Sequence, residues 1–258
     1  MTKTVLAVGA HPDDVEFMMA GTLLVLAEAG YEPHIFVVAS GSCGSMLIGK
    51  DELVRTRLKE AKAAAEQLKA RFYAPVVDDL EVTYSVPLLR KVAAVVREVQ
   101  PDIVLTHSPD EYMEDHTIAA RLTVTAVFSR GMPNFVTDPD RPVYNKDAVL
   151  YQCLPYGLCD TRGRRVEADC FVDITGVMDT KTRALSCHES QRNWLDTSQR
   201  MDSYVQSMQD MSLEVGRLSR HFKAAEGWRY HNYRGFCSEG ASPLEEALGA
   251  RFLPSQEV

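Results

Sequence analysis

The sequence predicts an α/β fold in which helices cover both faces of a mainly parallel sheet. Short apolar runs that are typical of buried strands alternate with longer segments whose apolar residues recur at helical spacing. The 258 residues are enough for one large core, and 45% hydrophobic and 25% charged residues is the composition of an ordinary globular protein. We therefore expect a single domain over residues 1–258.

Strands and helices alternate regularly in the first half of the chain. Strands are expected at residues 4–9, 34–39, 72–77 and 102–106, and helices at residues 14–29, 53–70, 86–99 and 116–128. Pro101 ends the third of these helices before the fourth strand begins. Because right-handed crossovers join successive parallel strands, this order predicts a Rossmann-like, doubly wound sheet.

The alternation of strands and helices is less regular in the second half of the chain. Residues 149–154 and 170–174 are expected as strands, residues 180–188 as a helix, and residues 195–223 as a long, partly helical segment. The segment 238–258 contains Ser, Gly and Pro, and we expect it to be a flap, an interface segment or a loosely ordered tail.

Charge and cysteine content exclude several classes of protein. A net charge of −8 and a pI near 5.4 argue against a nucleic-acid partner, because phosphate neutralisation needs a basic surface. No apolar stretch reaches the roughly 20 residues that span a bilayer, so we expect no membrane insertion and a cytoplasmic location. The six cysteines form no Cys-x-x-Cys pair and are interpreted as buried thiols. A homo-oligomer is left open.

His11, Asp13 and Asp14 directly follow the first expected strand, in a His-Pro-Asp-Asp segment. An imidazole and two carboxylates at one sheet edge suit zinc, since one carboxylate can bind the metal while the other handles protons. The alternative is an aspartate that caps the next helix beside a solvent-facing histidine. A cap does not explain a second strand end that carries histidines, so the sequence favours a metal site.

That second group follows the strand expected at residues 102–106. It comprises His107, Tyr112, Asp115 and His116. Ligands of doubly wound folds bind at the carboxyl ends of the strands, so we expect this loop to converge with residues 11–14 and 40–45. His107 is either a buried, hydrogen-bonded histidine or a direct part of the site.

The loop at residues 40–45 contains Ser42 between Gly41 and Gly44. It has neither the glycine spacing of a dinucleotide site nor the Gly-x-Ser-x-Gly turn of a serine hydrolase. The glycines are interpreted as serving a turn, with a phosphate-binding loop as the alternative. Ser42 is expected to contact the substrate as one of the hydroxyl-binding groups of a sugar pocket.

Together these residues resemble the LmbE-like zinc de-N-acetylases, a family that includes the N-acetylglucosaminyl-phosphatidylinositol deacetylases. The family hallmark is a first strand that ends in His-Pro-Asp-Asp. The resemblance covers residues 4–192, and its further matches are Ser40, Gly41, Gly44, Arg57, Glu60, Ala64, Leu68, Asp115, His116, Lys181, Ala184, Leu185, His188, Ser190 and Gln191. The first motif combined with a distal Asp-His and a His-x-Ser-Gln is far more specific than the first motif alone.

The resemblance implies a Zn²⁺ bound by His11, Asp14 and His116, with Asp13 as the general base. Fe²⁺ or Co²⁺ would fit the same nitrogen and oxygen ligands. Three protein ligands leave a position for water, whose pKa the metal lowers toward about 7. Hydrolysis of a linear acetamide would then release acetate and a free amine.

The chain departs from the family at Met113. Many members have His-Pro-Asp-His where this sequence reads Met-Glu-Asp-His at residues 113–116. A methionine donates no hydrogen bond, so the family histidine's task of polarising the carbonyl is absent or has moved to Tyr112, His107 or His188.

Two more residues are assigned to the site by similarity. Arg57 is expected to bind the substrate, with a surface ion pair to Glu60 as the alternative. His188 is expected to act in the site, with a contact to the helix dipole as the alternative.

We therefore predict a zinc-dependent hydrolase that removes the acetyl group from a small N-acetylated amino sugar or glycoconjugate. The alternatives are an amidase that acts on a non-sugar N-acyl compound and a metal-containing binding protein without chemistry. A sugar pocket should be lined by Arg57, Ser42, Asp115 and Glu114, and an apolar pocket by Met46, Leu47 and Met113.

Overall fold

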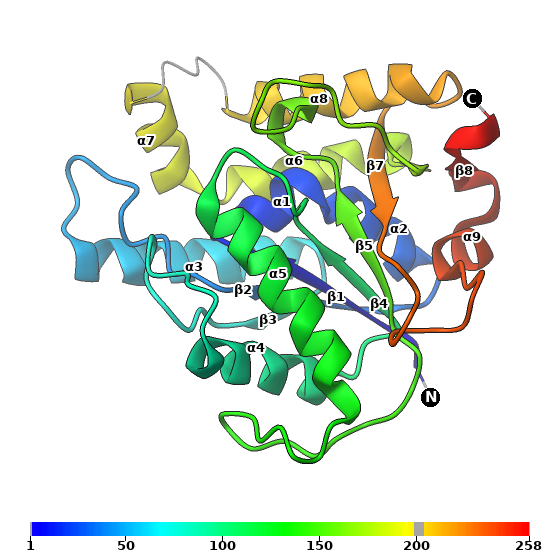
Figure 1. Cartoon of the computed structure of the whole chain (residues 1–258). Helices are drawn as coiled ribbons and strands as arrows, with labels where there is room; N and C mark the ends of the chain where they lie inside the picture. Colours follow the sequence, from blue (N-terminus) through cyan, green and yellow to red (C-terminus); the bar gives the residue numbers. More distant parts are fainter. Residues whose placement is uncertain (1, 199–203, 258) are drawn as a thin grey trace.

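The computed structural model describes residues 2–198 and 204–257, which are built around an eight-stranded sheet (Figure 1). The strand order is β3-β2-β1-β4-β5-β7-β6-β8. The strands are β1 (Thr4–Gly9), β2 (Glu32–Val37), β3 (Arg71–Tyr73), β4 (Ile103–Thr106), β5 (Val149–Cys153), β6 (Cys170–Asp173), β7 (Ala225–Tyr230) and β8 (Phe252–Pro254).

The first five strands run parallel and form the part of the sheet that carries the candidate site. β1 lies between β2 and β4, and the register pairs Gly9 with Val37 and Val8 with Thr106. The three strands therefore end at the same edge. β7, β6 and β8 are antiparallel to their neighbours. The predicted α/β fold with a mainly parallel sheet is confirmed.

Helices cover both faces of the sheet (Figure 1). α4 (Val86–Val99) and α5 (Glu114–Phe128) pack on one face, over Leu6, Val104 and Leu150. The other face carries α1 (Asp14–Met18), α2 (Ala20–Glu28), α3 (Lys50–Gln67), α6 (Met178–Ser186), α8 (Tyr204–Ser219) and α9 (Pro243–Leu248), with α7 (Glu189–Ser198) between α3 and α8. Short 3-10 turns are η1 (Ser129–Gly131), η2 (Tyr156–Leu158), η3 (Thr175–Val177), η4 (Gly249–Arg251) and η5 (Ser255–Glu257). Trp228 is fully buried in the second of these two layers, where its Nε1 donates a hydrogen bond to Thr22.

The helix expected over residues 14–29 is two helices. The chain leaves helical geometry at Met19, where φ is −133° and ψ is −15°. Met18, Met19 and Ala20 are all buried, so the apolar pattern runs through the break without marking it. Residues 10–13, which connect β1 to the short α1, lie at the carboxyl edge of β1.

The second half of the chain completes the sheet. β7 was not expected, because its Glu226 and Gly227 interrupt any strand-like alternation. The segment 238–258 supplies α9 and the edge strand β8, since Leu244, Phe252 and Leu253 are buried. A loosely ordered tail is therefore wrong for residues 243–254, and an interface role stays a prediction. α8 and the last four residues of α7 lie in the segment 195–223 that was expected to be partly helical, of which residues 199–203 are outside the described part, whereas α7 begins earlier, at Glu189.

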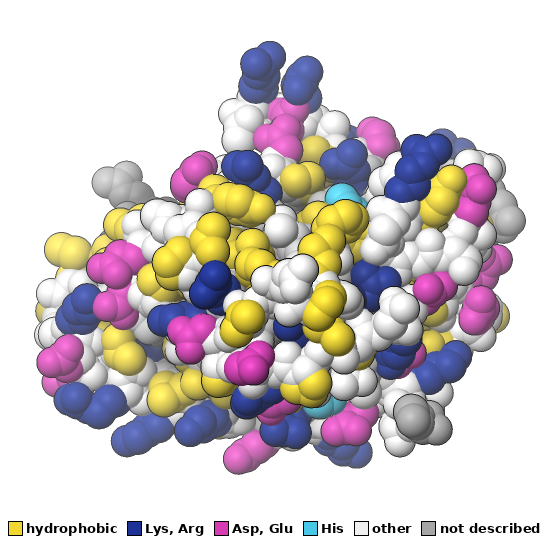
Figure 2. Space-filling view, turned by 60° about the horizontal axis from the view of Figure 1, so that its bottom comes forward, with side chains coloured by type: hydrophobic (Ala, Val, Ile, Leu, Met, Phe, Trp, Pro, Cys, Tyr) yellow, Lys and Arg dark blue, Asp and Glu magenta, His cyan; other side chains and the backbone are white. Residues whose placement is uncertain are grey.

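The surface carries charges of both signs. Acidic and basic side chains are interspersed over the face drawn in Figure 2, with apolar side chains near its middle. Among the described residues, no helix is both long enough and apolar enough to cross a membrane.

Candidate active site

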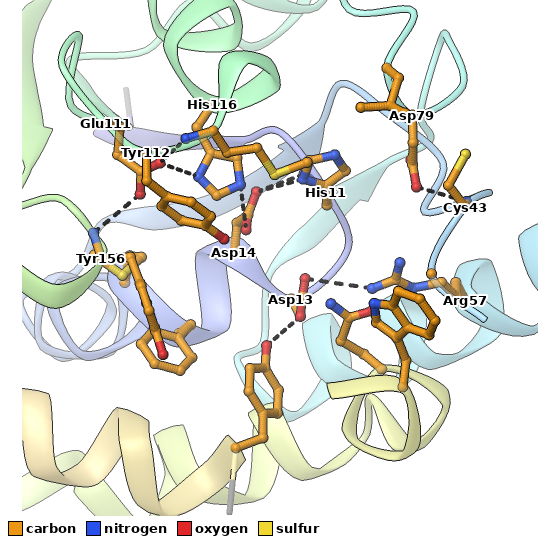
Figure 3. A pocket seen from close by; sticks show the side chains of 18 of the residues that line it. His11, Asp13, Asp14, Cys43, Arg57, Asp79, Glu111, Tyr112, His116 and Tyr156 are labelled. Atoms are coloured by element: carbon orange, nitrogen blue, oxygen red, sulfur yellow. Dashed lines mark hydrogen bonds and ion pairs between the residues drawn. The ribbon is translucent and has the colours of Figure 1, made fainter. Parts of the chain in front are cut away.

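Candidate metal ligands meet at the edge where β1 and β4 end. Residues 10–13 connect β1 to α1 at this edge, and α5 begins close by at Glu114. One ligand atom from each of His11, Asp14 and His116 lies within 4.8 Å of the other two. Figure 3 shows these three side chains pointing toward one another. They form a candidate metal site.

Both histidines are oriented by a buried carboxylate. His116 places Nδ1 2.8 Å from Glu111 Oε2, and its Nε2 lies 3.5 Å from Asp14 Oδ1. His11 places Nε2 3.0 Å from Asp115 Oδ2, and its Nδ1 lies 3.6 Å from Asp14 Oδ2. Metal-ligating histidines characteristically give their second ring nitrogen to a carboxylate in this way. The donor set therefore fits a metal ion.

The electrostatics of the cluster favour a cation. Burial lowers the pKa of His11, but hydrogen bonds to Asp115 and Asp14 outweigh it and raise the pKa to about 10. Burial raises the pKa of Asp14, but the charges of His116 and His107 outweigh it and hold the pKa well below its usual range. The carboxylates around the two imidazoles thus create a negative potential in which positive charge is stabilised.

Asp13 lies beside the cluster in the turn between β1 and α1. Its φ of 109° is in the left-handed region, which is sparsely populated by residues other than glycine and is often found at functional sites. Tyr204 donates a hydrogen bond to Asp13 Oδ2, and Arg57 Nη2 lies 3.7 Å from Asp13 Oδ1. Burial raises the pKa of Asp13 to about 6, although the charge of Arg57 opposes this rise. A carboxylate with such a pKa suits a general base near neutral pH.

Arg57 reaches the site from α3 and is only 2% exposed. It donates hydrogen bonds to the carbonyl oxygens of Gly41 at 3.2 Å and Pro12 at 3.1 Å. Gly41 has a φ of 77°, and a Cβ there would lie 2.5 Å from Arg57 Nη1, so glycine is required. Glu60 instead accepts hydrogen bonds from the backbone and hydroxyl of Ser190. The alternative of an ion pair between Arg57 and Glu60 is therefore wrong.

A cavity of about 610 Å³ opens over the candidate metal site. This volume is typical of a small-molecule pocket. Four aromatic rings form a continuous band on its wall, with centroid distances of 5.7 Å for Tyr112–Tyr156, 5.5 Å for Tyr156–Phe17 and 5.5 Å for Phe17–Tyr204. The described wall consists of His11, Asp13, Asp14, Phe17, Met18, Cys43, Gly44, Arg57, Asp79, Leu80, Glu111, Tyr112, Met113, His116, Tyr156, Cys159, Asp160, Gln191, Trp194 and Tyr204.

Tyr112 is the predicted carbonyl-polarising residue that the structure places on the wall. It is 61% exposed, and its ring contacts His116 edge-on at 5.6 Å between centroids. Partial burial and the charges of Asp14 and Glu111 raise the pKa of Tyr112. The hydroxyl stays protonated and can donate a hydrogen bond into the cavity.

Two residues predicted to contact substrate lie behind the described wall instead. Ser42 is buried, and its Oγ accepts the backbone N–H of Asp79 at 3.2 Å. Asp115 is buried, and its Oδ2 accepts hydrogen bonds from His11 and from the backbone of Leu80 at 2.9 Å. Because these oxygens serve the protein itself, direct substrate contacts from Ser42 and Asp115 are not supported.

His107 and His188 are also buried away from the wall. His107 Nε2 accepts the backbone N–H of Ala10 at 3.0 Å and lies 3.1 Å from Asp14 Oδ2, and its ring stacks on that of His116. His188 Nε2 lies 3.5 Å from the buried carboxylate of Glu16. Neither histidine reaches the cavity, so a substrate contact from His107 and a direct catalytic role for His188 are not supported. His107 supports the metal site from behind.

The cavity wall contains residues from both of the predicted linings, the polar one for a sugar and the apolar one for a non-sugar compound. Of the polar residues expected around a sugar, Arg57 lines the described wall, while Glu114 is exposed elsewhere. Of the apolar residues, Met113 lines the wall, while Met46 and Leu47 are exposed off it. The aromatic band was not expected and adds further apolar surface to the wall.

Sequence reasoning missed three residues of the site. Glu111 precedes the recognised motif, and its acidic side chain five residues before His116 was the available signal. Asp79 accepts the backbone N–H groups of Gly41 at 2.6 Å and Cys43 at 2.9 Å, so it shapes the loop over Arg57. Tyr204 lies 191 residues from Asp13 and carries no local signal.

Comparisons with known proteins agree with the geometry. The sequence model of the GlcNAc-PI de-N-acetylase family, PIG-L, matches residues 6–127. The diacetylchitobiose deacetylase of Thermococcus kodakarensis is 30% identical over 235 residues, which cover 88% of this chain and 83% of that protein. The 4-oxalmesaconate hydratase of Pseudomonas putida is 30% identical over 201 residues, which cover 74% of this chain and 75% of the relative.

A solved structure shows the same fold. GalB, the 4-carboxy-2-hydroxymuconate hydratase from Pseudomonas putida, aligns with a TM-score of 0.75 at 24% identity, covering 93% of this chain and 100% of that one. The long alignment with the deacetylase relative and the family match agree with the resemblance carried by the His-Pro-Asp-Asp segment. The chain belongs to the PIG-L, or LmbE-like, family of metal-dependent deacetylases, and it is an enzyme of that family.

Proposed function

We propose that the protein is a zinc-dependent hydrolase that removes the acetyl group from an N-acetylated amino sugar or glycoconjugate. The observation that carries this proposal is the cluster of His11, Asp14 and His116 with the unligated carboxylate of Asp13 beside it. A metal and a separate base within one cavity are the parts that amide hydrolysis needs. The named activity of the Thermococcus relative supports the choice of substrate.

His11, Asp14 and His116 would hold the metal, and nitrogen and carboxylate ligands of this kind suit zinc. When bound, zinc would polarise the acetamide carbonyl and lower the pKa of the attacking water toward about 7. Fe²⁺ or Co²⁺ would fit the same ligands, so metal content is part of the test below.

Asp13 moves the proton in the proposed reaction. It takes a proton from the water whose oxygen bonds to the carbonyl carbon, and it returns a proton to the amine nitrogen as the C–N bond breaks. The products are acetate and a free amine. Arg57 keeps positive charge beside Asp13, which favours the carboxylate form that accepts the proton in the first transfer and is regained after the second.

Tyr112 is the proposed hydrogen-bond donor to the carbonyl oxygen. It stands on the wall next to His116, in a chain that has Met113 at the family's histidine position. A donor that strengthens its bond as charge develops on this oxygen accelerates the reaction. The aromatic band beyond Tyr112 offers flat apolar surface to the rest of the substrate.

Replacing the base tests the proposal. With the zinc-loaded protein, we expect release of acetate and free amine from N-acetylglucosamine conjugates, and we expect Asp13→Asn to lower kcat about 10²- to 10⁴-fold. Zinc content should not change, because Asp13 is outside the ligand set. The matched control is Asp51→Asn on the exposed first turn of α3.

The other outcomes identify the alternatives. Turnover of simple N-acyl amides without turnover of sugars would replace the sugar proposal with the amidase. Ligand binding that is unchanged in Asp13→Asn, with no turnover by either protein, would contradict an enzymatic role for this residue.

A second candidate function is hydration of a carbon–carbon double bond in a small carboxylic acid. The Pseudomonas hydratase is as identical to this chain as the deacetylase is, and Arg57 on the wall suits a substrate carboxylate. Asp13 would again take a proton from water, whose oxygen bonds to one alkene carbon while a proton adds to the other. Hydration increases the mass of the substrate by one water and releases no acetate, so mass spectrometry of the products separates the two candidates.

A further inference from the structure

Tyr204 makes a contact that the family motifs do not describe. It is the first residue of α8, is 5% exposed, and lines the cavity. Its hydroxyl donates a hydrogen bond to Asp13 Oδ2, and its ring packs against Phe17 at 5.5 Å between centroids. The proposed base is therefore held from across the cavity by a helix far away in the sequence.

The two oxygens of Asp13 have different surroundings. Oδ2 accepts the hydrogen bond of Tyr204, whereas Oδ1 lies 3.7 Å from Arg57 Nη2, which is too far for a good hydrogen bond. Burial and the charges of Asp13 and Asp14 raise the pKa of Tyr204 far above its ordinary value, so its hydroxyl remains a donor. Oδ2 is thus occupied, and Oδ1 keeps a lone pair available.

Orientation matters for this carboxylate in particular. The terminal torsion of an aspartate is broad, so its two oxygens exchange places easily unless a partner fixes them. The backbone of Asp13 is also in the left-handed region, with a φ of 109°, a conformation that is often found at functional sites. A single donor on Oδ2 is enough to distinguish the two oxygens.

We propose that Tyr204 is a positioning residue that fixes the Asp13 carboxylate and reserves Oδ1 as the oxygen that accepts and returns the proton. This inference rests on the proposed function of Asp13 as the base. The proton leaves water for Oδ1 and passes from Oδ1 to the amine nitrogen, while the hydroxyl proton of Tyr204 stays on its own oxygen.

The first test is Tyr204→Phe, which keeps the ring on Phe17 and removes the hydroxyl. We expect kcat to fall on the order of 10- to 100-fold, as for other losses of alignment, with KM and zinc content close to those of the unmodified protein. Tyr144→Phe is the matched control, because Tyr144 is buried under α4 and α5 and its hydroxyl has no hydrogen-bond partner among the described residues. This control should retain full kcat. If Tyr204→Phe keeps the kcat of the unmodified protein, with or without a fall in thermal stability, the proposal is overturned.

The second test does not need turnover. The hydroxyl proton of Tyr204 should give a slowly exchanging, downfield proton resonance, which is absent in Tyr204→Phe, shifted upfield in Asp13→Asn and retained in Tyr144→Phe. A spectrum in which Asp13→Asn leaves that resonance in place would overturn the contact itself. If the contact is present but no acetamide is hydrolysed, the proposed function fails while the pairing of Tyr204 with Asp13 stands, and the kcat test moves to the hydration reaction.

Discussion

Glu111 and Asp115 each fix the orientation of one histidine in the candidate metal site. The carboxylate of Glu111 also accepts the backbone N–H of Tyr156 at 3.1 Å, which ties the orientation of His116 to the cavity wall. Burial raises the pKa of Glu111, but the hydrogen bond and charge of His116 outweigh it, so the pKa lies below its usual value. An ionised acceptor makes the His116 ring a more basic ligand.

Glu111→Gln should therefore weaken metal binding. The neutral amide accepts the His116 Nδ1 proton less strongly, and we expect zinc affinity to fall about 10- to 100-fold. Competition between the protein and a chromogenic chelator measures this change. Glu114→Gln is the control, because Glu114 is an exposed residue at the start of α5. Equal zinc affinities for the two variants would show that Glu111 does not tune the site.

At the residue scale, the sequence predicted the metal cluster but not its supports. His11, Asp14 and His116 occur in motifs with a chemical rationale, and the structure brings them together. Ser42 and His107 were predicted as substrate contacts because they lie on the right loops, but a loop position does not say which way a side chain points. The contact of Tyr204 with Asp13 could not be predicted from the sequence, because only the folded chain brings these two residues together.

At the element scale, one buried ion pair joins three elements on the face opposite α4 and α5. Lys181 of α6 donates to Glu226 Oε1 of β7 at 2.6 Å. The same carboxylate accepts the backbone N–H groups of Gly21 at 2.8 Å and Thr22 at 2.7 Å, close to the start of α2. The side chains of Lys181 and Glu226 are almost fully buried, so water cannot replace either partner if the other is removed.

Lys181→Met should destabilise the fold because it leaves the charge of Glu226 buried without its cation. We expect the free energy of unfolding to fall by about 3 to 5 kcal/mol. Urea denaturation followed by circular dichroism measures it. Arg251→Met removes the cation of the half-exposed pair with Glu28 and should cost less than about 1 kcal/mol. If the two variants lose similar free energies of unfolding, the Lys181–Glu226 pair is not a structural anchor.

Prediction of the elements succeeded where local signals were strong. β1 and α4 agree with the expected bounds residue for residue, because one is an uninterrupted apolar run and the other is amphipathic and followed by Pro101. The break at Met19 was missed because residues on both sides of it are buried. β7 was missed because Glu226 is stabilised by Lys181, a partner 45 residues away that no local pattern reveals.

At the scale of the whole molecule, metal binding and folding are linked. The three candidate ligands come from two segments about a hundred residues apart, and the unfolded chain does not hold them together. A ligand that binds only the folded state stabilises it by about 2.7 kcal/mol at a concentration one hundred times its Kd.

Removing the metal should therefore lower the thermal unfolding midpoint. We expect a chelator to decrease the Tm of the zinc-loaded protein and added zinc to restore it. In His116→Ala, which lacks one ligand, neither treatment should shift the Tm appreciably. Differential scanning calorimetry at several zinc concentrations measures the effect. A Tm independent of zinc in the unmodified protein would contradict a site formed by these residues.

The chain has two tryptophans, and they occupy contrasting environments. Trp228 is sealed in the core against Thr22, whereas Trp194 lies on the cavity wall. Intrinsic fluorescence therefore contains two separable reporters. Emission from Trp194 will respond when a compound enters the cavity, and emission from Trp228 will change only when the sheet and α2 come apart. Binding and unfolding can thus be followed optically in the unlabelled protein.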